Sequence, residues 1–382
     1  MFKQWRFIVL FVALFLALML AACASAPAPT AIPASSSVSS VASSSAASSA
    51  GPITVTDALN RTVKFDKAPQ RIVITGKAFF MIIDAIYMFP EAKQRVIGMN
   101  DTSQSKLDFM PLIDSNMSTK TLFTGSDVGP EQILPAKPDV VITKSVNASK
   151  LGKSLEQVNV PVVYVDFELP EQYARDLAIL GQLLGNVDRA KKIDAYYKTQ
   201  MDRVSAKTKN VKDADKPQVL LLQYAEKSGT IAFSIPPAEW MQTLIVEMAG
   251  GKAIWKSSSD KGGWAVVNLE QIAAWNPDMV FVVNYTGNSK EVVKKLQADP
   301  KWQSLQAVKN NKLYGFPSDF YTWDQPDSRW GMGLIWLATK IQPTLFGDVN
   351  IYQEINQFYA LYGLDESTIK AKVTPLLQGD LP

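Results

Sequence analysis

The sequence contains no histidine and a single cysteine among its 382 residues. Nucleophile pairs that need an imidazole base, such as Ser-His-Asp and Cys-His, are therefore absent. Zinc and copper sites built on imidazole or thiolate ligands are excluded for the same reason, and no metal site is expected. The one cysteine, Cys23, lies in an apolar amino-terminal segment. The folded part of the chain is thus expected to have no thiol and no disulfide.

The sequence also has little net charge. Its 39 basic and 36 acidic residues leave a balance of +3, which is too small to favour nucleic acid as a partner. Apolar residues make up 47% of the chain and charged residues 20%, the composition of an ordinary globular protein.

Residues 1–23 have the features of a targeting segment. Lys3 and Arg6 precede an apolar run of 14 residues, Phe7 to Leu20, a length that favours a signal peptide over a membrane span. Leu20-Ala21-Ala22-Cys23 resembles the lipobox of bacterial lipoproteins, in which the chain is cut before a cysteine that then carries diacylglycerol. The alternative is a plain signal peptide with an unmodified cysteine. We expect a lipid anchor at Cys23 on the outer face of the cell membrane.

Residues 24–52 consist almost entirely of Ala, Pro and Ser and carry no charge. Such a segment cannot bury enough apolar surface to offset the entropy lost on ordering, so it is expected to be a flexible tether. A glycosylated stalk remains the alternative.

The remaining chain contains an internal repeat. Val128–Ile133 and Pro138–Ile142 match Val267–Ile272 and Pro277–Phe281 without a gap, 139 residues further on. Both copies share Val, Glu, Gln and Ile, then Pro and Asp before a strand Val. The repeat predicts two similar α/β lobes, over residues 53–168 and 210–382.

The segment between the two copies is expected to be a linking helix over residues 169–209. Its apolar residues recur about every 3.6 positions, with polar residues on the other face. Gly185-Asn186 could end a first helix there, and Asp188 could start a second. A further matching pair, Pro69-Gln70 and Pro217-Gln218, opens an apolar run in each lobe.

Strands and helices alternate in both lobes, which predicts parallel sheets covered by helices on both faces. In the first lobe we expect a hairpin at 53–65, strands at 71–75, 95–98, 138–143 and 160–165, and helices at 79–88 and from 129. In the second we expect strands at 219–223, 279–283 and 312–316, and helices at 240–249, 269–275, 290–297, 329–341 and 351–362.

An ordered set of short motifs resembles one family across most of the chain. The matching residues are Thr56–Val63, Pro69–Val73, Glu131 with Lys137–Ile142, Leu180-Gly181, Leu184-Gly185, Arg189-Ala190, Gly250–Lys252, Glu270 with Asn276–Asp278, and Trp302 with Leu305–Asn310. They resemble class III periplasmic binding proteins, the substrate-binding lipoproteins of ABC importers for iron–siderophores, haem, cobalamin and related ligands. The resemblance implies two Rossmann-like lobes joined by one long helix, and a cleft that closes only slightly. The absence of histidine departs from the branch that binds bare zinc or manganese.

In open α/β sheets, ligands bind beyond the carboxyl ends of the strands. The residues expected there as ligand-binding residues are Lys77, Tyr224, Trp240, Trp264, Tyr285, Tyr321, Trp323 and Arg329. The aromatic rings would stack on a bulky chelate. Lys77 and Arg329, with Lys144, would pair with an anionic ligand. The alternative for the lysines is a solvated surface position.

Glu131 and Glu270 occupy equivalent places in the two copies of the repeat. A carboxylate in the first turn of a helix is favoured by the helix dipole, which could alone explain both. The family resemblance adds a second role, in which these two glutamates meet arginines of the permease dimer. Both roles can hold at once.

The sequence therefore predicts a monomeric, extracytoplasmic solute-binding lipoprotein that needs no cofactor and is not an enzyme. We expect it to capture a metal chelate, a ferric siderophore in the first instance, and to deliver it to an ABC permease. Haem, a corrinoid or an oxyanion such as molybdate are the alternative ligands. A carboxylate-based extracytoplasmic hydrolase is the alternative of another class, although no pair of carboxylates stands out as general acid and base.

Overall fold

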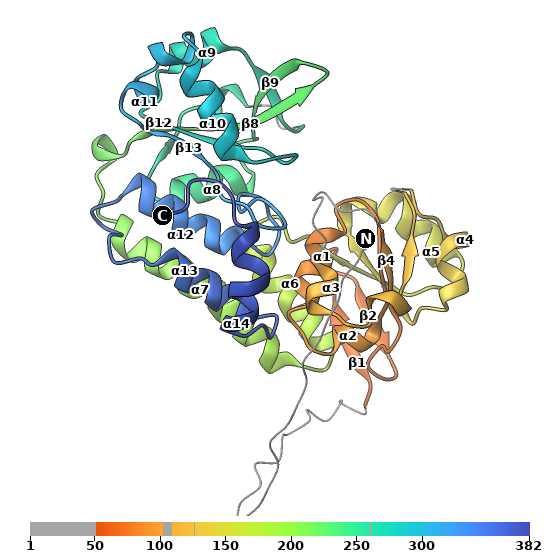
Figure 1. Cartoon of the computed structure of the whole chain (residues 1–382). Coiled ribbons are helices and arrows are strands. Elements are labelled where there is room, and N and C mark those ends of the chain that lie inside the picture. Colours follow the sequence, from red (N-terminus) through yellow and green to blue (C-terminus); the bar gives the residue numbers. More distant parts are fainter. Residues whose placement is uncertain (1–50, 102–108, 126, 260–261) are drawn as a thin grey trace, which may run out of the picture. The chain divides into compact units, whose positions relative to one another are not determined.

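The computed structural model describes residues 51–101, 109–125, 127–259 and 262–382. Its elements follow one another as two α/β lobes with a helical connection between them (Figure 1). Cys23, the signal peptide and the tether lie outside the described residues. Among the described helices, none has both the length and the apolar character needed to cross a lipid bilayer.

The N-terminal lobe contains a five-stranded sheet in the order β5-β4-β3-β6-β7, with every neighbouring pair parallel. Its strands are β3 (Ile72–Ile74), β4 (Val96–Asn100), β5 (Thr121–Phe123), β6 (Val140–Lys144) and β7 (Val162–Val165). Its helices are α1 (Phe80–Ile86), α2 (Ala92–Arg95), α3 (Met110–Ile113), α4 (Pro130–Ile133) and α5 (Lys153–Gln157). Strands β3, β6 and β7 are buried along their whole length, as expected for a parallel sheet that is covered on both faces.

The predicted hairpin precedes this sheet as β1 (Ile53–Thr56) and β2 (Thr62–Phe65), paired antiparallel. Asn60 takes the left-handed conformation in its turn, with φ 59°. Asp57 is buried and accepts hydrogen bonds from the Leu59 and Arg61 amides, at 3.0 Å each. The Arg61 side chain in turn donates to the Val162 carbonyl at 2.8 Å, which fastens the hairpin to β7.

The C-terminal lobe contains a mixed sheet in the order β11-β9-β8-β12-β13, with β10 beside β8. Its strands are β8 (Gln218–Lys227), β9 (Thr230–Ile235), β10 (Lys252–Ala253), β11 (Ala265–Val267), β12 (Met279–Val283) and β13 (Leu313–Gly315). Its helices are α8 (Met241–Met248), α9 (Leu269–Trp275), α10 (Ser289–Ala298), α11 (Gln306–Lys309), α12 (Trp330–Ile341), α13 (Ile351–Ala360) and α14 (Glu366–Thr368). Strands β8, β10, β12 and β13 are parallel, as the repeat predicts.

Strand β9 is antiparallel to both β8 and β11, which the sequence analysis did not foresee. A two-residue turn joins β8 to β9, with Ser228 at φ 52° and Gly229 at φ 79°. Two consecutive left-handed residues match the twist of an antiparallel hairpin. The Ser228-Gly229 pair could therefore have predicted the hairpin that adds β9 to the sheet.

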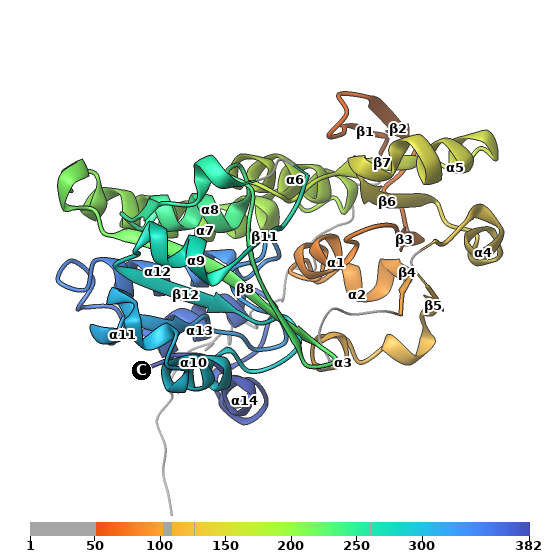
Figure 2. The same cartoon turned by 90° about the horizontal axis from the view of Figure 1, so that it is seen from above.

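The linking segment predicted over residues 169–209 consists of two helices, α6 (Pro170–Leu183) and α7 (Val187–Thr208), with the break at the Gly185-Asn186 pair named from the sequence. Gly185 ends the first with φ 67°, and the Asn186 side chain caps the second by accepting from the Arg189 amide at 3.1 Å. A Cβ atom at Gly181 would lie 2.6 Å from the Ala190 Cβ, so the helices touch where the chain reverses. In both views α7 runs beside α12 and α8 (Figures 1 and 2).

One large hydrophobic cluster extends through both lobes and the connecting helices. Every residue of helix α1 except Asp84 belongs to this cluster, and so does most of α12. All of the described residues accordingly belong to one compact unit.

Candidate functional site

The loop after β3 carries the site residue expected from the N-terminal lobe. Lys77 is exposed, and its amide donates to the Asn147 side-chain oxygen at 3.1 Å. Gly76 and Ala78 on either side have φ values of 101° and 58°. A left-handed alanine is strained and persists only where its surroundings hold it, a situation common at functional sites. The loop thus presents Lys77 to solvent from a constrained backbone.

Lys144, at the carboxyl end of β6, is placed differently from the sequence expectation. It is buried, its ammonium pairs with Glu168, and it approaches the Met81 sulfur at 2.9 Å. Burial lowers the pKa of Lys144, and the Glu168 carboxylate works against that shift. In this arrangement the charge of Lys144 is taken up by Glu168.

Three of the predicted aromatic residues come together in the C-terminal lobe. Trp240 precedes α8, Trp264 precedes β11, and Tyr285 follows β12. The Trp240 and Trp264 rings meet edge to face with centroids 5.9 Å apart, and Trp264 and Tyr285 do so at 6.0 Å. All three rings keep partial exposure. We call these three residues the aromatic wall.

Asp324 lies directly behind the aromatic wall. It is completely buried and accepts a hydrogen bond of 2.7 Å from the Tyr285 hydroxyl. The Gln242 amide also donates to it, at 3.4 Å. Burial raises the pKa of Asp324, and these hydrogen bonds oppose the shift. The sequence analysis did not single out Asp324, because nothing in the sequence around it indicates that it pairs with Tyr285 and Gln242.

Tyr321 links the two lobes rather than standing open beside the wall. Its ring stacks on Phe80 of α1, with centroids 5.7 Å apart and planes at 15°. The Tyr321 ring also contacts the Arg329 guanidinium, whose carbon lies 4.9 Å from the ring centroid. Only 8% of Tyr321 is exposed, so it can offer a ligand little more than a ring edge.

The predictions for Trp323 and Arg329 need correction. Both side chains are fully buried. The Trp323 indole donates to Asp319 at 2.9 Å and has no surface on which a ligand could stack. The Arg329 guanidinium pairs with Asp84 at 2.6 Å and with Asp319 at 2.5 Å. These two carboxylates neutralise the positive charge of Arg329, which was expected to pair with an anionic ligand.

Tyr224 belongs to the surroundings of β8 and β9. Only 4% of it is exposed, its hydroxyl donates to Glu226 at 2.6 Å, and its ring meets Phe233 at 6.0 Å. Burial and the neighbouring carboxylate raise the pKa of Tyr224 to about 12. Its contacts do not bring it to the aromatic wall.

Glu131 and Glu270 are exposed at the second residue of α4 and of α9, as the repeat predicts. Other side chains cap these helices. Gln132 accepts from the Gly129 amide at 3.1 Å, and Asn268 accepts from the Gln271 amide at 2.8 Å. Within the described part of the chain neither glutamate forms an ion pair, so both carboxylates face solvent.

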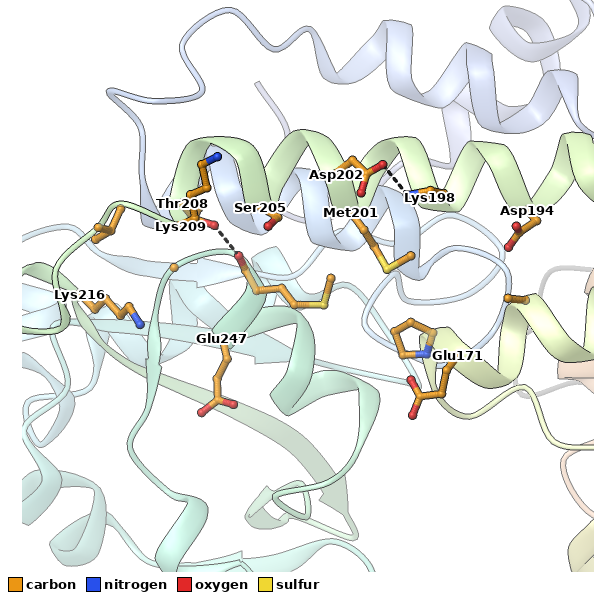
Figure 3. A pocket seen from close by; sticks show the side chains of 15 residues that line it. Glu171, Asp194, Lys198, Met201, Asp202, Ser205, Thr208, Lys209, Lys216 and Glu247 are labelled. Carbon is orange, nitrogen blue, oxygen red and sulfur yellow. Dashed lines mark hydrogen bonds and ion pairs between the residues drawn. The ribbon is translucent and has the colours of Figure 1, made fainter.

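A separate pocket of about 700 Å³ lies between α6, α7 and α8 (Figure 3). Met201 and Met248 form part of an apolar surface there, and Glu171, Asp194 and Lys209 stand among the charged residues around it. None of the predicted ligand-binding residues lines this pocket. It lies along the connecting helices and not at the carboxyl ends of the strands.

The described residues contain no group of three or more His, Cys, Asp or Glu side chains placed to hold a metal ion. The side chains at the strand ends are aromatic rings, Lys77 and a hydrogen-bonded carboxylate. Such a set can bind and orient a preformed ligand by stacking and charge.

Comparison with known proteins also indicates a protein that binds a solute. The Periplasmic binding protein family matches residues 100–320, more than half of the chain. The molybdate-binding protein MolA of Haemophilus influenzae is 23% identical over 326 residues, covering 80% of this chain and 89% of the relative. The Fe(3+) dicitrate-binding periplasmic protein FecB of Escherichia coli is 26% identical over 267 residues, covering 69% and 81%.

A solved structure shows that the fold extends over the whole of such a protein. The periplasmic solute-binding protein of Veillonella parvula superposes with a TM-score of 0.68 at 22% identity, covering 85% of this chain and all of that one. Two lobes, their strand-end residues and these matches define a solute-binding protein. The chain belongs to the periplasmic binding protein family, in its class III branch, as the sequence motifs indicated. The relatives named above are binding proteins and not enzymes.

Proposed function

We propose that this chain is a lipid-anchored receptor that captures an iron complex, in the first instance a ferric siderophore, and delivers it to an ABC permease. The aromatic wall is the observation that carries the choice of ligand. The Trp264 ring lies about 6 Å from both Trp240 and Tyr285, and the three partly exposed rings offer an apolar aromatic surface that suits a bulky chelate. Exposed Lys77 would contribute charge for an anionic complex.

The names of the relatives support this choice and also define its rival. FecB is named for ferric dicitrate, whereas MolA is named for molybdate. A small oxyanion would depend on lysines and backbone amides and would leave the aromatic wall without a role. Haem and corrinoids would use the wall as a siderophore does, and they are the remaining ligands to compare.

Tryptophan fluorescence tests the proposal directly, because the eight tryptophans beyond Trp5 all lie in the C-terminal lobe. Five of them are buried, while Trp240 and Trp264 are part of the wall. Titration with a ferric siderophore, ferric citrate, haem, cobalamin and molybdate should give saturable quenching with an iron complex. Quenching by molybdate alone would overturn the iron assignment. Turnover of a glycoside or phosphoester would favour the hydrolase alternative.

Delivery to the permease would use Glu131 and Glu270. Both carboxylates are exposed, occupy equivalent positions in the two lobes, and are not needed as helix caps. We propose that each meets arginines of the permease dimer, with Cys23 supplying the lipid anchor that keeps the receptor nearby. A monomer is expected, and the protein itself would need no cofactor.

A further inference from the structure

A buried ion-pair cluster joins the two lobes. It consists of Arg329, Asp319 and Asp327 from the segment before α12 and Asp84 from α1, and we call it the Arg329 cluster. The Arg329 Nη1 atom lies 2.6 Å from an Asp84 oxygen and 3.6 Å from an Asp327 oxygen, while its Nε atom lies 2.5 Å from Asp319. Asp84 is the member that belongs to the N-terminal lobe.

The Arg329 cluster contains more negative than positive groups. Three carboxylates face one guanidinium, and none of the four side chains has more than 4% exposure. Full ionisation would leave an excess of negative charge in the interior, which is unfavourable. Among the described residues, one oxygen each of Asp84 and Asp327 and the Nη2 atom of Arg329 have no hydrogen-bond partner. A proton on one carboxylate would reduce the excess of negative charge.

The other groups around Asp84 are hydroxyls. The Tyr362 hydroxyl, after α13, donates to the Asp84 carbonyl at 3.0 Å and accepts from the Ser328 hydroxyl at 2.7 Å. Tyr173 of α6, Tyr197 of α7 and Tyr359 of α13 also face the cluster. Burial raises the pKa of all four tyrosines, so they stay neutral and leave the carboxylate charge to Arg329.

Burial raises the pKa of Asp84 from 3.8 to about 6, against the attraction of Arg329. Burial likewise raises the pKa of Asp327. In a local opening of α1, Asp84 meets water and its pKa returns towards the ordinary value. The form in which α1 is docked on the C-terminal lobe therefore binds the proton more tightly than the locally opened form. By linkage, a lower pH favours contact and a higher pH favours separation.

We propose that docking of α1 on the C-terminal lobe takes up a proton at the Arg329 cluster, so that α1 is held more firmly in mildly acidic than in alkaline surroundings. Helix α1 begins shortly after the loop that carries Lys77 and Ala78. A firmer α1 would fix that loop, whichever ligand the protein binds. Local opening of α1 would release the proton.

Hydrogen exchange of the α1 amides, followed from pH 4 to pH 8 and corrected for intrinsic rates, tests the coupling in the full chain. The opening constant should rise between about pH 4 and the raised pKa of about 6, by at most tenfold per pH unit for one linked proton, and level off above it. Asp84→Asn imitates the protonated form and should make the protection of α1 independent of pH. The control is Asp324→Asn, a buried aspartate whose partners Tyr285 and Gln242 lie within the C-terminal lobe.

Wild-type protection that does not change over this range would overturn the proposal. So would an Asp84→Asn variant that keeps the wild-type slope, or an Asp324→Asn variant that loses it. If Asp84→Asn does not fold, infrared spectroscopy of the wild type decides. The C=O stretch of a buried protonated carboxyl should be present at pH 5 and decline above about 6. Absence of that band at pH 5 would rule out the bound proton.

Discussion

Phe80 of the N-terminal lobe and Tyr321 of the C-terminal lobe stack with their ring centroids 5.7 Å apart. Phe80 has 6% exposure and belongs to the hydrophobic cluster that both lobes share. Phe80→Ala should lower the free energy of unfolding by about 3 kcal/mol, because it removes a buried ring and leaves a cavity. Urea denaturation measures the loss. Leu122→Ala, at a half-exposed position, is the control and should cost under about 1 kcal/mol. Equal losses would mean that the interlobe stack adds nothing.

The aromatic wall should matter for ligand affinity more than for stability. Trp264→Ala removes the middle ring of the wall and should weaken binding by about tenfold, the equivalent of about 1.4 kcal/mol of stacking. Trp255→Phe, at a fully buried position whose indole donates to Pro236, should lower stability and leave affinity unchanged. Isothermal titration and denaturation together separate the two effects.

Met201→Ala is the control for ligand location. Met201 lines the pocket between α6, α7 and α8, which is separate from the wall. Loss of affinity in this variant with none in Trp264→Ala would move the binding site to that pocket.

Charge reversal at Glu131 and Glu270 should abolish uptake by whole cells while leaving ligand affinity intact, because under the proposed docking like charges would then face arginines of the permease. The matched control is Glu291→Arg, another exposed glutamate in the first turn of a helix. Uptake and equilibrium binding are the two readouts. A loss of affinity in the double variant would indicate a structural role for the glutamates instead.

Asp176 should prove important for the turn that enters the connecting helices. Its Oδ2 atom accepts hydrogen bonds from the amides of Asp166 and Phe167, at 2.7 and 2.8 Å. Phe167 is held at φ 54°, a strained value for an aromatic residue. Asp176→Ala leaves two amides unpaired and should cost about 2–4 kcal/mol in the free energy of unfolding. A loss below about 1 kcal/mol would show that water replaces the carboxylate.

The contribution of Asp84 to the free energy of unfolding should be lost as pH rises to about 6. Its folded pKa of about 6 lies above the unfolded value of 3.8, so its contribution is fully present below the unfolded value and is lost as pH rises through the folded one. Urea denaturation from pH 4 to pH 8 should show a smaller decline for Asp84→Asn than for the wild type. Parallel curves for the two proteins would contradict the assignment.

Regular elements were predictable where local pattern and burial agree. Helix α9 and strand β12 lie at the residues predicted, because a capping Asn268 and a Pro277-Asp278 pair mark their starts. The internal repeat also revealed the two lobes, since each copy must bury the same apolar face. The edge strand β11 and the short strand β5 were missed, because their positions depend on pairing with strands that are distant in sequence. Strand β9 was missed although its Ser228-Gly229 turn carried a local signal.

The candidate site was only partly predictable, for a reason that Arg329 illustrates. An arginine in a loop rich in aromatic and acidic residues has the composition of a binding site. Its partner in the other lobe, Asp84, lies 245 residues away in sequence, and no local pattern connects them. A signal did exist, because Asp84 is the one charged residue between Phe79 and Phe89. A carboxylate inside so apolar a helix requires a buried partner.

The hydrophobic cluster shared by both lobes has a consequence for dissecting this protein into fragments. If the gene were split between α7 and β8, each of the two polypeptides would expose the apolar surface that it buries against the other in the intact chain. We expect such fragments to be insoluble when made singly and to recover native structure only when produced together. Heat should likewise melt the intact chain in one calorimetric peak, even though it is built from two sheets.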